Sequence, residues 1–153
     1  MCYFQGPEEL LGPFYSPRAG QAMRGKCILV VDDEPHVVHV IGRKLSDAGF
    51  EVLTAADGEE ALAIATAELP DLIITDDQMP VLSGLELCER LKVSPRTGQI
   101  PAMLVTARGD DPPKERLDKT NIRLVLNKPF SPREILSNVN AVLGNITDAG
   151  EGS

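Results

Sequence analysis

Short apolar runs alternate with longer amphipathic segments along most of this chain. From Lys26 onward we count five apolar runs of strand length and five segments with apolar residues at helical spacing. Four of the apolar runs end directly before polar residues, and these are residues 28–31, 72–75, 102–105 and 122–126. Strands that alternate with helices of about 10 to 15 residues are typical of successive βαβ units. The pattern therefore predicts an α/β domain with a parallel sheet.

The expected helices are marked by apolar stripes and by capping residues. The first, from about residue 34 to 48, places Ile41 and Leu45 on one apolar face. Three others begin at capping-box spacings, which are Asp57 with Glu60, Ser83 with Glu86, and Ser131 with Glu134. Pro132 at the first helical position supports the last of these. We expect the fourth helix to be short, because residues 109–113 contain a glycine and two prolines.

Composition and punctuation predict the domain boundaries. A chain of 153 residues has room for one domain with modest tails. Residues 1–25 contain several prolines and no sustained period, so we interpret them as a leader or linker. Tyr3 to Gly6 resembles the remnant of an engineered protease site, which makes an expression scar one alternative for part of this segment. We expect the folded domain at residues 26–144, with Gly144 as a helix stop and residues 145–153 as a disordered tail.

The composition argues against several classes of protein. A net charge of -8 argues against a broad nucleic-acid-binding surface, so we expect no direct contact with nucleic acid. No apolar run approaches the roughly 20 residues that span a bilayer, and no secretion signal is visible, so we expect a cytoplasmic protein without membrane contact. Cys2, Cys27 and Cys88 show no metal-ligand spacing, and we expect Cys27 and Cys88 to be small core residues.

Polar side chains follow the apolar runs and share a chemistry. They are Asp32 and Asp33, then Asp76, then Thr106, and finally Lys128. In an open parallel sheet the carboxyl ends of the strands lie at one edge, and ligands bind in the crevice beside it. Three carboxylates at this edge would repel one another unless a cation intervened, and carboxylate oxygens suit Mg²⁺. A metal, a lysine and a hydroxyl together provide the charge neutralisation that phosphoryl transfer requires.

The expected roles follow from this set. Asp76 attacks phosphorus and becomes an acyl phosphate, so Asp76, Thr106 and Lys128 are the predicted catalytic residues. Mg²⁺ and Lys128 neutralise two of the phosphoryl oxygens. The Thr106 hydroxyl and a neighbouring backbone N–H, which we assign to Ala107, bind another oxygen.

These motifs, in this order and spacing, closely resemble the receiver domain of two-component response regulators, of the chemotaxis-regulator type. The resemblance extends from about Lys26 to Leu143. It rests on the motifs at residues 28–35, 70–76, 79–84, 100–107 and 128–130. It implies a doubly wound five-stranded parallel sheet of flavodoxin-like order 2-1-3-4-5, with helices on both faces.

The resemblance also implies a place in a phosphorelay. Asp76 takes a phosphoryl group from a sensor histidine kinase or a phosphotransfer protein, and the domain then acts on a downstream protein partner or a fused output domain. Asp33, Asp76 and the Gln78 carbonyl bind Mg²⁺, and Asp32 helps through water. The peptide bond between Lys128 and Pro129 is expected to be cis. Such a domain catalyses its own phosphorylation and dephosphorylation without turning over a separate substrate, so its status as an enzyme stays open.

Several alternatives stay open beside this interpretation. Val125 stands three residues before the lysine, where the family usually has Tyr or Phe. This leaves open a pseudo-receiver that binds partners without phosphorylation, although the intact Asp76, Thr106 and Lys128 argue against it. A Mg²⁺-dependent phosphatase needs a second acid two residues after its nucleophile, and Gln78 occupies that position. Asp77 is a rival acceptor, one residue too close to the motif that follows. His36 and His39 are one helical turn apart, which is compatible with a metal site, with a phosphohistidine or with solvent-facing residues.

Overall fold

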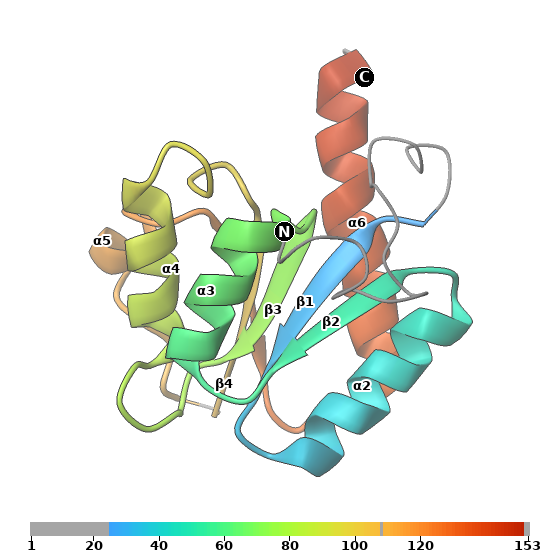
Figure 1. Cartoon of the computed structure of the whole chain (residues 1–153), viewed down its shortest axis with the longest axis horizontal. Helices are drawn as coiled ribbons and strands as arrows, with labels where there is room; N and C mark the ends of the chain where they lie inside the picture. Colours follow the sequence, from blue (N-terminus) through green and yellow to red (C-terminus); the bar gives the residue numbers. More distant parts are fainter. Residues whose placement is uncertain (1–24, 108, 152–153) are drawn as a thin grey trace.

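The computed structural model describes residues 25–107 and 109–151, with side chains described through residue 144, and Figure 1 shows the arrangement of its elements. The strands are β1 (Cys27–Val31), β2 (Glu51–Ala55), β3 (Leu72–Asp76), β4 (Ala102–Thr106) and β5 (Ile122–Asn127). The helices are α2 (Pro35–Asp47), α3 (Gly58–Glu68), α4 (Gly84–Val93), α5 (Lys114–Leu117) and α6 (Pro132–Glu151). The predicted leader, residues 1–25, lies almost entirely outside the described residues.

The described strands form one parallel sheet of five strands in the order β2-β1-β3-β4-β5. This confirms the predicted doubly wound order. The chain moves outward from β1 to one edge, returns, and continues to the other edge. The strand order therefore reverses between β1 and β3, and in open α/β sheets such a switch point is where ligands bind.

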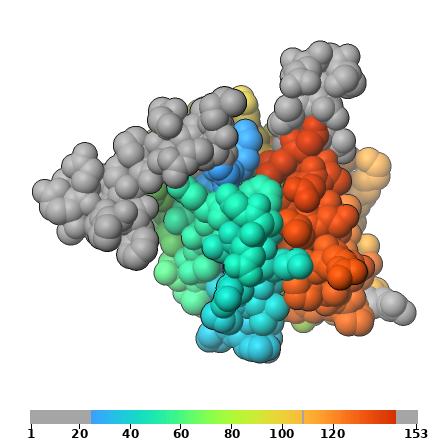
Figure 2. Space-filling model, turned by 90° about the vertical axis from the view of Figure 1, so that its right-hand side faces the viewer, coloured from blue at the N-terminus to red at the C-terminus, as the bar shows by residue number. Residues whose placement is uncertain are grey.

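Helices cover both faces of the sheet. In Figure 1, α3 and α4 lie over one face, while α2 and α6 lie over the other. Figure 2 shows α6 beside α2 on that second face. Successive strand residues point to opposite faces, so Leu29 and Val31 join one hydrophobic cluster and Ile28 and Val30 join another. The sheet thus separates two apolar layers, and polar residues follow the carboxyl ends of its strands.

The predicted helix starts are confirmed by their hydrogen bonds. Ser83 accepts from the Glu86 N–H at 3.1 Å, while the Glu86 carboxylate accepts from the Ser83 N–H at 3.0 Å, which is a complete capping box. Ser131 and Glu134 form the same pair of bonds. Asp57 caps α3 by accepting from the Glu60 N–H at 2.8 Å.

The predicted end of the last helix is wrong. Helix α6 continues through Gly144 to Glu151. A glycine stop depends on a left-handed backbone, and Gly144 does not adopt a positive φ, so its residue type alone does not end the helix. The short fourth helix is confirmed, because α5 contains four residues and buries none of them.

Two further predictions concern cysteines and membranes. Cys27 and Cys88 are buried, as expected for small core residues, and burial raises the pKa of the Cys88 thiol to about 12. Within residues 25–107 and 109–151, no helix is long and apolar enough to cross a bilayer.

Candidate functional site

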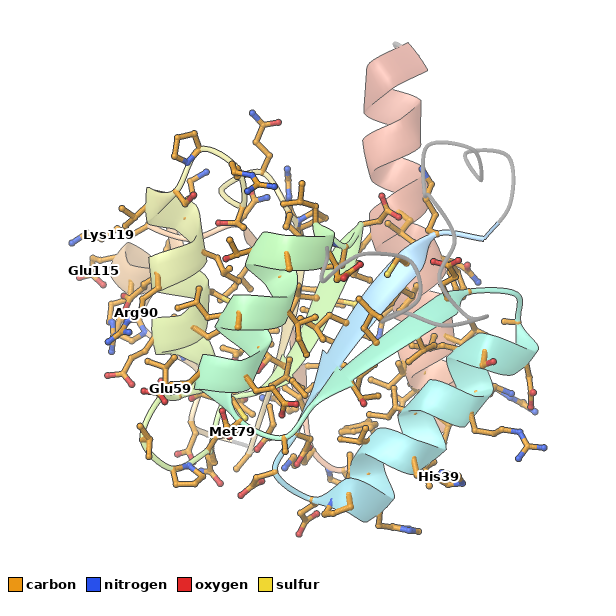
Figure 3. All side chains as sticks on the ribbon, viewed as in Figure 1. His39, Glu59, Met79, Arg90, Glu115 and Lys119 are labelled. Atoms are coloured by element: carbon orange, nitrogen blue, oxygen red, sulfur yellow. The ribbon has the colours of Figure 1, made fainter. Side chains whose placement is uncertain are left out.

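The predicted site residues lie at the carboxyl edge of the sheet. Asp32 and Asp33 follow β1, Asp76 ends β3, Thr106 ends β4, and Lys128 follows β5 directly. Because all the strands are parallel, these positions share one edge, which lies at the bottom of Figure 1 and near the labelled Met79 in Figure 3. The order of strands therefore brings together residues that are far apart in the sequence.

Asp76 and Lys128 form the central ion pair of this edge. Lys128 Nζ lies 2.9 Å from Asp76 Oδ1, and the aspartate side chain is only 4% exposed. Among the described residues, no group meets hydrogen-bond geometry with this buried oxygen, so the ion pair alone compensates it. Although partial burial disfavours its charged form, the neighbouring carboxylate raises the pKa of Lys128. The lysine is therefore a fixed positive charge beside Asp76.

Three carboxylates converge beside that pair. Asp32, Asp33 and Asp76 each offer an oxygen, and these oxygens lie within 4.8 Å of one another. Burial, with the negative charge of Asp76, raises the pKa of Asp32 to about 6. Burial also raises the pKa of Asp76, and Lys128 opposes this increase without cancelling it. A crowded, oxygen-only donor set, in which one buried oxygen accepts no hydrogen bond from the described residues, fits a hard divalent cation such as Mg²⁺.

Local hydrogen bonds hold the acidic turn after β1. The Asp32 N–H donates to the Ala55 carbonyl on β2 at 3.2 Å, and Asp32 Oδ1 accepts from the Glu34 N–H at 2.9 Å. Pro35 then begins α2, which has no side-chain cap. The bond to Glu34 fixes the Asp32 side chain, whereas the Asp33 side chain is exposed.

Thr106 is buried, and its hydroxyl has two side-chain partners. Thr106 Oγ1 accepts from Asn127 Nδ2 at 3.0 Å and donates to Asp111 Oδ1 at 3.3 Å. Asn127 also donates to the same Asp111 oxygen at 2.7 Å. Asn127 and Asp111 are not among the site residues predicted from the sequence. One signal was present for Asn127, since it ends a strand beside the predicted lysine, but nothing in the sequence places Asp111 against it.

The rival acceptor Asp77 has a structural role. Its carboxylate accepts from the Leu85 N–H at 3.0 Å, and its carbonyl accepts from the Gly84 N–H at 3.1 Å. Both bonds tie the end of β3 to the start of α4, which supports assigning the acceptor role elsewhere. Only glycine fits at position 84, because a Cβ there would lie 2.3 Å from the Asp76 carbonyl oxygen.

Four other predictions concern the surroundings of the site. The Gln78 side chain donates to Asp110 at 3.0 Å, while its carbonyl stays a predicted metal ligand. The peptide bond between Lys128 and Pro129 is cis, as expected. His36 and His39 are exposed, and Figure 3 shows His39 pointing away from the sheet. Among the described residues, neither histidine joins the acidic group.

The sequence between residues 28 and 140 matches the family model of the response regulator receiver domain. The chain belongs to this family. The match covers the sheet, the acidic cluster and the ion pair. The curated PhoP of Bacillus subtilis, described as an alkaline phosphatase synthesis transcriptional regulatory protein, is 40% identical over 118 residues. The phosphate regulon transcriptional regulatory protein PhoB of Pseudomonas aeruginosa is 40% identical over 121 residues.

Coverage differs between these relatives and the solved receivers. The alignments include 77% and 79% of this chain but only 48% and 53% of PhoP and PhoB, so the chain spans about half the length of these curated relatives. The chemotaxis response regulator CheY4 of Vibrio cholerae is 33% identical with a TM-score of 0.71, and the match covers 77% of this chain and 98% of CheY4. The shared part is therefore a receiver domain. PhoP and PhoB are described as transcriptional regulatory proteins, so the comparisons do not confirm the predicted absence of contact with nucleic acid.

One structural relative bears on the metal. The receiver domain of the sensor histidine kinase PA1611 from Pseudomonas aeruginosa is described with a magnesium ion coordinated in its active site cleft. It is 28% identical to this chain with a TM-score of 0.69, and the match covers 78% of this chain and 98% of that domain. Receiver domains generally bind Mg²⁺, and the acidic cluster of this receiver contains the carboxylate oxygens that suit this ion.

Proposed function

We propose that this receiver domain takes a phosphoryl group onto Asp76 and thereby changes its binding to a partner. The observation that carries the proposal is the buried Asp76 carboxylate, 2.9 Å from the Lys128 ammonium and beside two further acids. In the transfer, an oxygen of Asp76 forms a bond to phosphorus while the bond from phosphorus to its donor breaks, and the donor leaves with that electron pair. Lys128 then neutralises one phosphoryl oxygen.

The acidic residues are proposed to hold Mg²⁺. Asp33, Asp76 and the Gln78 carbonyl bind it directly, and Asp32 acts through water. When bound, Mg²⁺ supplies positive charge that offsets both the clustered carboxylates and the phosphoryl oxygens. Asp32 Oδ1 is already fixed by the Glu34 N–H, which supports a role for this residue as a positioned outer acceptor.

Thr106 and Ala107 are proposed to bind a further phosphoryl oxygen. Thr106 is buried at the end of β4, and Ala107 follows it at the same edge of the sheet. In the structure the Thr106 hydroxyl donates to Asp111. Binding a phosphoryl oxygen therefore requires the hydroxyl to exchange that partner, which couples phosphorylation to the loop after β4.

The partners follow from this chemistry. We propose that a sensor histidine kinase or a phosphotransfer protein is the donor, with a phosphohistidine P–N bond breaking in the transfer. The receiver at residues 26–144 then acts on a downstream protein or on a fused output domain. The length of the curated relatives supports a fused output domain, since this chain aligns with about half of each.

A pseudo-receiver is the second candidate, and one feature favours it. Val125 is only partly buried on β5 and pairs with Leu104, where receivers usually carry an aromatic ring. The neighbouring α5 has four residues, none of them buried. A small aliphatic side chain cannot exchange between exposed and buried positions as a ring does, so partner binding without phosphorylation is the alternative.

Intact-mass spectrometry with acetyl phosphate and Mg²⁺ tests the proposal. Wild-type protein is expected to gain one phosphoryl group, and Asp76→Asn and a metal-free sample are expected to gain none. Asp77→Asn is the matched control, because this neighbouring acid is bonded to the start of α4 and should leave the adduct in place. If the wild type gains no adduct and binds no beryllofluoride, the pseudo-receiver takes precedence.

A further inference from the structure

A small polar network joins the ends of β4 and β5 to the loop that follows β4. Thr106 and Asn127 are paired residues in the register of these strands, and the Lys128 N–H donates to the Thr106 carbonyl at 2.8 Å. Asn127 donates both to Thr106 and to Asp111, and Thr106 donates to Asp111. Each of the three side chains thus contacts the other two. We name Thr106, Asp111 and Asn127 the threonine latch.

The latch uses the same hydroxyl that the phosphoryl group needs. A threonine hydroxyl has one proton and donates one hydrogen bond at a time. In the structure this proton is directed to Asp111, a carboxylate on the loop. A phosphoryl oxygen on Asp76 is a competing acceptor for the same proton. The two bonds exclude each other, so forming one requires breaking the other.

We propose that Asp111 and Asn127 are positioning residues that hold the Thr106 hydroxyl away from Asp76 and release it when the acceptor is phosphorylated. This inference rests on the proposed function and deepens it by naming residues that set the position of the switch. Asn127 orients both partners by donating to each, and Asp111 accepts the hydroxyl proton. Among the described residues, neither Asp111 nor Asn127 forms a hydrogen bond or an ion pair with Asp76.

The latch also connects the site to the loop between β4 and α5, which is the segment expected to change when Thr106 is released. Asp111 lies in the segment between Thr106 and α5, and the adjacent Asp110 accepts from the Gln78 side chain at 3.0 Å. The Asp110 N–H donates to the Ala107 carbonyl at 3.0 Å, a bond that joins the two ends of the turn after β4. Release of Thr106 frees one of these attachments. The loop between β4 and α5 is therefore the route of the response in a domain without the usual aromatic ring.

The test measures beryllofluoride affinity with Mg²⁺, by NMR titration of backbone amides, in wild type and variants. Asp111→Ala removes the acceptor and is expected to tighten binding about three- to tenfold, the effect of losing one hydrogen bond from the unliganded state. Asn127→Ala carries no charge change and should also tighten binding. The double variant should gain less than the product of the two effects, because both act on one network.

Charge must be separated from the hydrogen bond, because removing any nearby acid favours an anion. Asp110→Asn is the matched control: it removes an equal charge from the same loop and leaves the bonds of Thr106 intact. We expect it to change affinity less than about twofold. Asp111→Asn keeps an acceptor oxygen and should stay closer to wild type than Asp111→Ala. Equal tightening in the three variants that remove an acid, which are Asp111→Ala, Asp111→Asn and Asp110→Asn, would assign the effect to charge and overturn the latch.

A second measurement needs no phosphoryl mimic. Three-bond couplings to the Thr106 methyl carbon report its χ1 rotamer in the free protein. A single rotamer in wild type that becomes averaged in Asp111→Ala and Asn127→Ala supports the latch, and an unchanged rotamer in both contradicts it. If wild type binds no beryllofluoride, the proposed function fails, and these couplings still decide whether the latch holds Thr106.

Discussion

Asp32→Asn should make the metal-free protein more stable at neutral pH. The wild-type side chain is only 6% exposed and shares its site with the carboxylates of Asp33 and Asp76. Its pKa is raised from 3.8 to about 6, mainly by burial, so keeping it ionised opposes folding. The change removes that charge, and the amide oxygen of asparagine can still accept from the Glu34 N–H.

The size of the effect follows from the pKa. A rise from 3.8 to about 6 is about two pKa units, and at about 1.4 kcal/mol each this gives about 3 kcal/mol above pH 6. Because the folded protein binds the proton more tightly, the free energy of unfolding falls as pH rises from about 4 to about 6. Below about pH 4 the carboxyl is protonated in both states, so wild type and Asp32→Asn should have similar stability there.

Urea unfolding followed by far-ultraviolet circular dichroism measures this, since the chain contains no Trp. We expect the two proteins to differ at pH 7.5 in EDTA and to converge at pH 4. Mg²⁺ should stabilise wild type more than the variant, because the metal relieves the same repulsion. Glu115→Gln is the control, since this exposed acid points outward from α5 in Figure 3. A variant that is equally stable or less stable than wild type in EDTA at pH 7.5 would refute the reasoning.

Four further predictions concern stability and use the same unfolding measurement. Gly84→Ala should lower the free energy of unfolding by at least about 2 kcal/mol, because the added Cβ would meet a backbone oxygen at 2.3 Å. Gly144→Ala should raise it by about 0.5–1 kcal/mol, because position 144 has open space and lies in helix α6. Asp57→Ala should lose about 1 kcal/mol through its cap of α3, and an unchanged midpoint would contradict that role. Arg116→Ala should lower the free energy of unfolding only slightly despite two bonds to Glu89, because the Arg116 side chain is exposed and water screens the pair.

The sheet could be predicted because its strands are buried on both faces. All five residues of β1, of β3 and of β4 are buried, and such strands are written in the sequence as continuous apolar runs. The edge strand β2 shows only one buried residue, so its signal is weaker. The end of α6 could not be predicted, since a glycine ends a helix only where the backbone turns left-handed, and residue type does not determine that turn.

Some residues of the site could also be predicted from the sequence, and others could not. Asp32, Asp33, Asp76, Thr106 and Lys128 could be placed together because each follows a strand of a parallel sheet. Asp111 could not, because it lies in a loop whose path depends on a positive φ at Gly109 and on hydrogen bonds to Thr106 and Asn127. Loop side chains have no period that relates them to the sheet. The hydrogen-bond partners of a loop side chain therefore depend on the path of the folded backbone, which the sequence pattern does not give.

The separation of the interior by the sheet has a consequence for how this sequence can change. Ile28 and Leu29 are adjacent in the chain, yet one packs with the layer under α2 and α6 and the other with the layer under α3 and α4. Substitutions that share no packing partners tend to have additive effects on stability. One layer can therefore acquire a new set of packed side chains while the side chains of the other layer stay the same. Compensating substitutions then accumulate independently in the two halves of the interior.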